Sequence, residues 1–401
     1  MTLYWLLVLS SLSSSGSHAL GGDDPKPGQV PTDPGQIAHV RVARQALAAA
    51  MREADLDSIV AAEAEVRKSL GPFAGVPETA ETLTSPGTKA QRPSAADFKK
   101  LTARMGSIAS GGNDAKNNRM ELRNSAYLAI GLLAMAEAKL PDATEYRKQA
   151  AVELDYLISK QADEGYFPYP ADPIAPPHLQ KLAAKVAKEN PDKVKGGLIY
   201  LAADGAQFDT GCASFALAYG HELLKEERFL QAARKAGDWA LDFPLSTNWN
   251  YNSFSVWQLA KLAEVTGERK YRDGAVRMAR LGVLPGLMDN GRWSDQHNAK
   301  AVYHWIMVRG LVALLRVLPG EDPDAKVIHA KTKLAVQSRV EDVLRDGGGN
   351  SVHAYVALAE ALDFFGPEER WERAMDEIGG ISPYSAGVFA RREARTKSLG
   401  K

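Results

Sequence analysis

The sequence contains a single cysteine, Cys212, and has no surplus of charge of either sign. One cysteine excludes an intramolecular disulfide and argues against a cysteine-based metal site. The chain carries 49 Lys and Arg against 49 Asp and Glu, so no overall field favours nucleic acid, an acidic membrane or a polyanion. We therefore expect no nucleic-acid and no membrane partner, and any recognition of an anion has to be local. The apolar surroundings of Cys212 predict a buried, inert thiol.

Long apolar runs are also missing, apart from one at the start of the chain. Beyond that run, no stretch approaches the roughly 18 to 20 apolar residues that a membrane span requires. Residues 1–19 combine the apolar run from Leu3 to Leu9 with Ser17-His18-Ala19, which is typical of a signal-peptide cleavage site, although no Lys or Arg precedes the run. The sequence therefore predicts a secreted or periplasmic protein.

Composition divides the remaining chain into four parts. Residues 20–37 are rich in Gly, Pro and Asp, which indicates a flexible leader. Residues 38–120 form an N-terminal helical segment, in which a helix from His39 to Leu70 is followed by a loop rich in Pro, Gly and Thr. We expect residues 121–390 to form the main, catalytic domain and residues 391–401 to be a basic, frayed tail.

A short sequence motif, called the phrase below, recurs through the main domain, each time between two segments with helical periodicity. Each copy contains charged residues and ends in an aromatic residue, and the copies are Leu224–Phe229, Val265–Tyr271, Phe365–Trp371 and a weaker one at Leu140–Tyr146. We interpret the phrase as a tight turn between two helices, with the aromatic side chain packing between them where they meet at the turn. The spacing indicates a repeat of two helices in roughly 40 to 50 residues.

Strand patterns are nearly absent, which predicts an all-α fold. Hairpins of this length fit an α-solenoid or an α/α toroid. Two loops between hairpins, Asp163–Tyr169 and Asp289–Trp293, carry Asp-x-Gly followed by aromatics. Such loops suit stacking on sugar rings at one mouth, so we predict an incomplete α/α toroid with Tyr166 and Tyr169 as binding residues. The alternative is that these aromatics only pack one hairpin on the next. The extra residues 168–201 predict a long loop with a short helix.

Unusual polar and aromatic residues concentrate in two segments of the main domain. The first, Ser246–Phe254, contains three asparagines, of which a helix N-cap explains only one. The second, Gly291–Arg309, contains two His, a Tyr, two Arg and two Trp. Two of its residues, His297 and His304, would share a helical face if the helix began early enough. Because no third His is near, we expect no metal and no cofactor.

The two segments resemble the toroid lyases that cleave uronic-acid polysaccharides, among them alginate lyases and hyaluronate or chondroitin lyases. In those families an Asn opens one helix, a later loop supplies a His, and a Tyr follows in the next helix. This chain has Asn248-Trp249-Asn250, then Gln296-His297, then Tyr303, in the same order. It departs from the pattern where Tyr251 follows Asn250, since the alginate-lyase branch has His there. Gln296 also stands where that branch has an Arg, which leaves Arg292 or Arg309.

The resemblance implies β-elimination on an alginate- or glucuronan-type polymer, and the residues suit this chemistry. A C5 proton can be removed only if the uronate carboxylate is neutralised, and Asn250 and Arg292 are suitable donors. His297 is a suitable base and Tyr303 a suitable acid, or both acid and base. We expect the remaining candidates to bind the acidic polysaccharide; they are Asn248, Trp249, Tyr251, Trp293, His304, Tyr166, Tyr169, Asp209 and Arg309.

Other functions remain open from the sequence. A glycoside hydrolase on the same toroid would need two carboxylates, which Asp209 with Asp295 or Asp163 could supply. Asp209 as a helix N-cap is the structural alternative. A uronyl C5-epimerase would share the proton abstraction without bond cleavage, and a non-catalytic helical-repeat binding protein would not need His297 and Tyr303.

Overall fold

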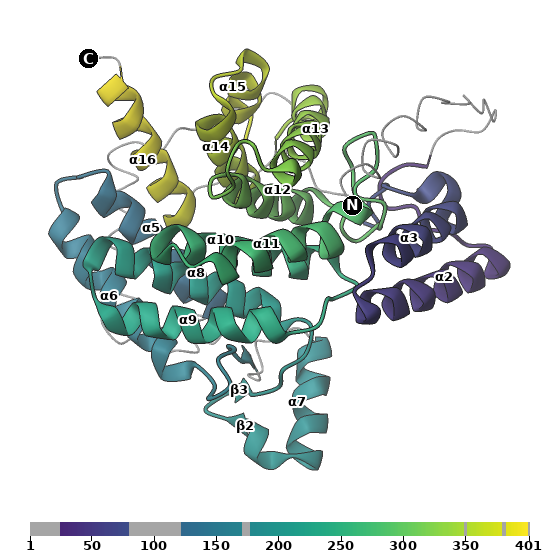
Figure 1. Ribbon diagram of the computed structural model, residues 1–401, viewed down its shortest axis with the longest axis horizontal. Helices are drawn as coiled ribbons and strands as arrows, with labels where there is room; N and C mark the ends of the chain where they lie inside the picture. The colour runs from purple at the N-terminus through teal and green to yellow at the C-terminus, as the bar shows by residue number, and fades with distance from the viewer. Residues whose placement is uncertain (1–24, 80–121, 171–176, 349–350, 379–381, 400–401) are drawn as a thin grey trace.

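The computed structural model describes residues 25–79, 122–170, 177–348, 351–378 and 382–399. The described chain is helical apart from one small antiparallel sheet of two-residue strands, in the order β1 (Tyr169–Pro170), β3 (Leu198–Ile199), β2 (Val194–Lys195) (Figure 1). The predicted all-α fold is confirmed. None of the described helices is long and apolar enough to cross a membrane. The predicted signal peptide, the start of the leader and the second half of the N-terminal segment lie outside the described residues.

Six helices form an inner ring. Each packs on the next, and the last returns to the first; they are α5 (Leu122–Glu137), α8 (Ala206–Leu224), α10 (Trp249–Thr266), α12 (Ala301–Leu315), α14 (Val352–Phe365) and α16 (Pro383–Leu399). Five of them are followed by an outer helix, namely α6 (Ala143–Lys160), α9 (Glu227–Asp242), α11 (Arg269–Gly282), α13 (Pro323–Asp346) and α15 (Glu369–Asp376). Because α16 lacks such a partner in the described chain, the predicted incomplete α/α toroid is confirmed.

The recurring phrase forms the turns of four hairpins, as predicted. It joins α5 to α6, α8 to α9, α10 to α11 and α14 to α15. Its terminal aromatics, Tyr146, Phe229, Tyr271 and Trp371, are all buried in the core. Burial of a large ring removes enough apolar surface from water to fix the angle between the two helices of each hairpin.

Glycines allow the inner helices to approach closely. A Cβ on Gly387 of α16 would lie 2.3 Å from the carbonyl oxygen of Gly131 in α5. A Cβ on Gly211 of α8 would lie 2.6 Å from the Phe254 Cβ in α10. Real side chains do not tolerate such distances, so the ring closes at this diameter only because these positions have no side chain.

The N-terminal segment forms a hairpin of two helices beside the ring, drawn in purple in Figure 1. The expected single helix from His39 to Leu70 was wrong. The chain forms α2 (Pro34–Glu53) and α3 (Leu56–Leu70), separated at Ala54, which has φ 53°, and Asp55, whose carboxylate accepts the Ser58 N–H as an N-cap. Helix α2 also begins inside the predicted leader, because Asp33 caps it. Short helix η1 (Gly71–Phe73) follows α3.

Two further expectations concern the long loop and the tail. The long loop does carry a short helix, α7 (Pro177–Glu189), followed by η2 (Pro191–Lys193) and the small sheet. The predicted frayed tail was wrong, because α16 continues to Leu399. Its arginines Arg391 and Arg395 lie 3.7 and 3.1 Å from the Glu137 carboxylate at the end of α5. These ion pairs hold the last turns of α16 against the ring.

Alternation of inner and outer helices makes all six inner helices parallel. Residues at the N-terminal ends of neighbouring inner helices meet, as Arg123 of α5 and Asp209 of α8 do. The loops that lead from an outer helix to the next inner helix therefore gather at this end, and we call it the N-terminal mouth. Short helix η3 (Leu284–Gly286) lies in one such loop.

Candidate functional site

The N-terminal mouth holds a stacked His–Tyr pair. Tyr303 is in the first turn of α12, and His297 lies in the loop before it. Their ring centroids are 4.3 Å apart with an interplanar angle of 25°. Helix α12 begins at Ala301, so His297 and His304 are not on one helical face. Among the described residues, no three His, Cys, Asp or Glu side chains come together as a metal site.

Glu78 from the N-terminal segment orients the His297 ring. The His297 Nδ1 lies 3.0 Å from Glu78 Oε1, and the same oxygen is 2.8 Å from Lys300 Nζ. Partial burial alone would raise the pKa of Glu78, but hydrogen bonds from Lys300 and His297 outweigh it and hold the pKa below its usual value. An ionised Glu78 only accepts, so Nδ1 carries a proton, which leaves Nε2 as the ring nitrogen that can act as a base.

Tyr251 brings a second phenol to the mouth. It lies in the first turn of α10 and is half-buried. Burial raises the pKa of Tyr251. Tyr303 and Asp209 raise it further, and the positive charge of Arg123 opposes the rise. Its hydroxyl therefore stays protonated at neutral pH and is a hydrogen-bond donor.

Asp209 and Arg123 form an ion pair between the neighbouring inner helices α8 and α5. The guanidinium Nε and Nη2 donate to the two carboxylate oxygens at 3.0 and 2.9 Å. Asp209 is buried, and Arg123 lies 4.0 Å from the centroid of the Phe208 ring. The alternative of Asp209 as an N-cap was wrong, because Gly205 occupies the cap of α8 and Asp209 lies within the first turn.

The asparagines form an amide cluster beneath the loops. Asn250 Nδ2 donates to Asn248 Oδ1 at 2.7 Å and to Asn298 Oδ1 at 3.0 Å. Both hydrogens of the Asn250 amide are therefore engaged, although its buried Oδ1 has no partner among the described residues. The amide of Asn252 binds the backbone of Ser246 and Gly282. In this arrangement Asn250 shapes the loop rather than offering an N–H to a ligand.

Several predicted site residues lie away from the stacked pair. Arg292 donates to the Asp342 carboxylate on α13 at 2.5 and 2.6 Å. Trp249 and Trp293 are buried in the core, and the Trp293 indole N–H donates to the Val283 carbonyl at 2.9 Å. These two rings therefore support the loops from below and do not present a face to a sugar.

His304 and Arg309 are buried inside the toroid. His304 Nε2 donates to the Ala335 carbonyl on α13 at 2.9 Å, and burial, helped by Arg339, lowers its pKa well below the usual value. Arg309 stacks on the Trp257 ring at 3.7 Å, about two helical turns below the mouth. Its Nη1 donates to the Tyr384 hydroxyl at 3.1 Å, while Nε and Nη2 have no partner in the described chain.

The two loop tyrosines are also buried. Tyr166 packs against Trp239 of α9 with ring centroids 5.8 Å apart. Tyr169 donates from its hydroxyl to the Ala203 carbonyl at 3.0 Å. Burial raises the pKa of both phenols, to about 12 for Tyr166. Tyr166 thus packs one hairpin on the next, as the alternative interpretation held. Tyr169 does not only pack, because Asp209 and Tyr251 also contribute to the rise of its pKa.

The structure brings some predicted residues together and adds others. His297, Tyr303, Tyr251, Asp209 and the Asn248–Asn250 pair share the mouth. Glu78, Arg123 and Lys300 were missed by the sequence analysis. Lys300 lies within a segment that had been singled out, but Glu78 follows a Gly- and Pro-containing stretch with no motif, and Arg123 opens an ordinary apolar helix.

Comparison with known proteins finds little similarity in sequence. No protein-family model matches the chain, and no curated protein matches it. Among solved structures, the chain is similar to the GH76 α-mannanase of Bacteroides thetaiotaomicron, with a TM-score of 0.44 and 12% sequence identity, covering 69% of this chain and 86% of that chain. The likeness concerns the course of the backbone, so the roles of side chains follow from the contacts of this chain alone.

Proposed function

We propose that the protein is a polysaccharide lyase that cleaves a uronic-acid polymer by β-elimination at the N-terminal mouth of the toroid. The observation that carries the proposal is the stacked pair of His297 and Tyr303, with the His297 ring oriented by Glu78. A proton acceptor and a proton donor on adjacent rings are what the reaction requires. Export of the protein, which residues 1–19 suggest, would fit a polymeric substrate.

The first requirement is to neutralise the uronate carboxylate. Arg292 cannot do this while it is bound to Asp342, and both N–H groups of Asn250 are engaged. Arg123 and Lys300 at the mouth are likewise paired, with Asp209 and Glu78. We therefore assign the carboxylate first to the protonated Tyr251 hydroxyl, with the two cations adding positive charge nearby, because donors and positive charge stabilise the enolate-like state that forms when C5 loses its proton.

The second requirement is to move two protons. Nε2 of His297 takes the C5 proton, the electron pair of the C5–H bond forms the C4–C5 double bond, and the C4–O4 bond breaks. Tyr303 gives its phenolic proton to the departing O4. Exchange with solvent then returns the proton from His297 and restores the phenol. The product carries an unsaturated sugar at its new non-reducing end.

Hydrolysis is the less well supported alternative. A hydrolase would require two carboxylates that face the substrate. Asp209 is buried and held by both nitrogens of Arg123, and Asp295 is bound by Arg44 at 2.8 Å. Neither carboxylate is placed to attack or to activate water in this arrangement. Asp163 is exposed, and the carboxylate next to it, Glu164, lies 3.8 Å from Lys193 Nζ.

Product analysis tests the proposal directly. The protein is incubated with alginate, glucuronan, pectate and glycosaminoglycans, and absorbance of the unsaturated product is followed in the ultraviolet. We expect elimination on one of these polymers and a loss of at least about 100-fold in kcat for Tyr303→Phe. Tyr200→Phe, which removes a phenol elsewhere, is the matched control. Chain shortening without ultraviolet absorbance would replace the lyase with a hydrolase, and full activity of Tyr303→Phe would overturn the mechanism.

A further inference from the structure

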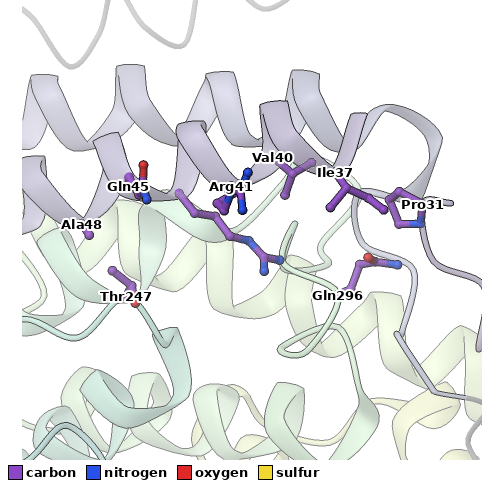
Figure 2. Close-up of a pocket in the computed structure, with 9 residues that line it drawn as sticks. Pro31, Ile37, Val40, Arg41, Gln45, Ala48, Thr247 and Gln296 are labelled. Carbon is purple, nitrogen blue, oxygen red and sulfur yellow. The ribbon is translucent and has the colours of Figure 1, made fainter. Parts of the chain in front are cut away.

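A groove separates α2 from the loops of the N-terminal mouth. Its volume is about 430 Å³. Figure 2 shows Ile37, Val40, Arg41 and Gln45 on α2, with Thr247 and Gln296 on the loops opposite. The groove is thus built from two parts of the chain that are far apart in sequence.

Two residues that line the groove are next in sequence to residues of the candidate site. Thr247 directly precedes Asn248 of the amide cluster, and Gln296 directly precedes His297. Gln296 Nε2 also donates to the carbonyl of Gln29, in the segment before α2, at 3.0 Å. A chain molecule bound at His297 and Tyr303 could therefore pass along the same two loops into the groove.

The wall of the groove formed by α2 carries positive charge, and the facing wall formed by the loops is uncharged. Arg41 and Arg44 both line it from α2. Arg44 is balanced by Asp295, at 2.8 Å, but Arg41 is exposed and has no ion pair among the described residues. Thr247 and Gln296 on the facing wall are uncharged hydrogen-bonding groups. The groove thus carries one unbalanced positive charge in a molecule whose total charge is zero.

Apolar surface lies beside this charge. Ile37 is 49% exposed although it is a large aliphatic residue, and Val40 and Ala48 continue the same face of α2. A cation, an amide, a hydroxyl and an aliphatic patch in one groove match a sugar ring that bears a carboxylate, since such a ring has an apolar face, hydroxyls and one negative charge.

We propose that this groove is a binding subsite for a further carboxylated sugar residue of the polymer, with Arg41 bound to its carboxylate. The inference rests on the proposed function for the identity of the ligand. It adds that affinity depends on chain length, because only a polymer or a long oligosaccharide can reach from the stacked pair to α2.

Binding measurements test the subsite separately from catalysis. The full-length protein is run by affinity electrophoresis in gels that contain alginate, glucuronan or neutral mannan. We expect an acidic polymer to retard the protein, and Arg41→Glu to weaken that binding about five- to tenfold at low salt. Arg52→Glu, an exposed arginine on α2 that does not line the groove, is the matched control and should bind as the unchanged protein does.

The outcomes distinguish the subsite from the reaction. Weaker binding by Arg41→Glu alone supports the subsite, even if no polymer yields an unsaturated product and the lyase proposal fails. Equal binding by Arg41→Glu and the unchanged protein overturns it, as does equal weakening by Arg52→Glu, which would indicate a diffuse charge effect. Retardation by neutral mannan that Arg41→Glu leaves unchanged also contradicts a carboxylate-binding role. Thermal unfolding of each variant verifies that the exposed substitutions leave the fold intact.

Discussion

At the scale of single residues, a carboxylate from outside the toroid contacts the proposed base at the mouth. Glu78 accepts from both His297 and Lys300 and so fixes the tautomer of the proposed base.

We expect Glu78→Gln to lower kcat about tenfold or more with little change in KM, because an amide can present its NH2 group to Nδ1 and favour the wrong tautomer. Steady-state kinetics on the identified polymer measure this. Glu53→Gln, an exposed change on α2, should leave kcat unchanged, and an unchanged kcat for Glu78→Gln would remove Glu78 from the mechanism.

A second glutamate makes stability depend on pH. Burial raises the pKa of Glu63 to about 7, despite its hydrogen bonds with Ser294 and Arg67. The folded chain therefore holds this proton more tightly than the unfolded chain. The resulting stabilisation is complete below pH 4.5, declines as the pH rises, and is lost above about pH 7.

Glu63→Gln tests this linkage, because glutamine resembles the protonated acid. We expect the variant to be more stable than the unchanged protein at pH 8, by on the order of 2 kcal/mol, and to lose the decline between pH 5 and 8. Urea unfolding at both pH values measures the difference. Glu65→Gln, an exposed neighbour on α3, should keep the original dependence, and parallel curves for Glu63→Gln and the unchanged protein would refute the assignment.

At the scale of helices, α12 presents different faces to the mouth and to the core. Tyr303 faces His297, whereas the next residue, His304, bridges to α13 and lies 4.8 Å from the Trp293 ring. We expect His304→Ala to reduce the free energy of unfolding by about 2 to 4 kcal/mol through loss of a buried ring and its hydrogen bond. Activity per folded molecule at low temperature should remain within a few fold. A selective loss of kcat at full stability would instead place His304 in the reaction.

Closure of the ring depends on contacts between α16 and α5. Gly387→Ala would bring a Cβ to 2.3 Å from the Gly131 carbonyl oxygen, so the two helices would have to separate. We expect this single methyl group to cost about 1 to 3 kcal/mol. Gly320→Ala, where an added Cβ meets nothing within 4 Å, is the matched control. Thermal unfolding followed by circular dichroism compares the two, and equal midpoints would mean that the ring tolerates wider packing.

The hairpins could be predicted from the sequence because their turn phrase is local, and each copy closes a turn between neighbouring helices. The α12–α13 turn has no such aromatic and was not found in this way. The site was less predictable, because its partners are remote along the chain. The His297–Glu78 contact joins residues 219 positions apart, and the Arg123–Asp209 pair spans 86. Arg292 and Trp293 belonged to a conspicuous motif, but burial and the Asp342 carboxylate direct them away from the mouth.

At the scale of the whole molecule, the N-terminal hairpin holds the loop that carries His297. The Gly75 N–H donates to the Ser294 carbonyl at 2.8 Å, and the Glu78 N–H donates to the Gln296 carbonyl at 3.2 Å. Glu63 binds the Ser294 hydroxyl, and the Arg67 guanidinium donates to the Pro285 carbonyl. The proposed site is therefore complete only while the hairpin is docked.

Weakening this docking should separate loss of activity from loss of helix. Arg67→Ala removes a hydrogen bond across the interface, worth about 1 kcal/mol, together with the contact at 3.4 Å between Arg67 and Glu63, and it leaves the inner ring untouched. We expect activity to disappear at a temperature several degrees lower than in the unchanged protein, while the midpoint measured by circular dichroism moves less. Arg52→Ala, which is exposed on α2, should shift neither. If activity and helicity fall together in Arg67→Ala, the hairpin and toroid unfold as one unit, and local undocking does not control the site.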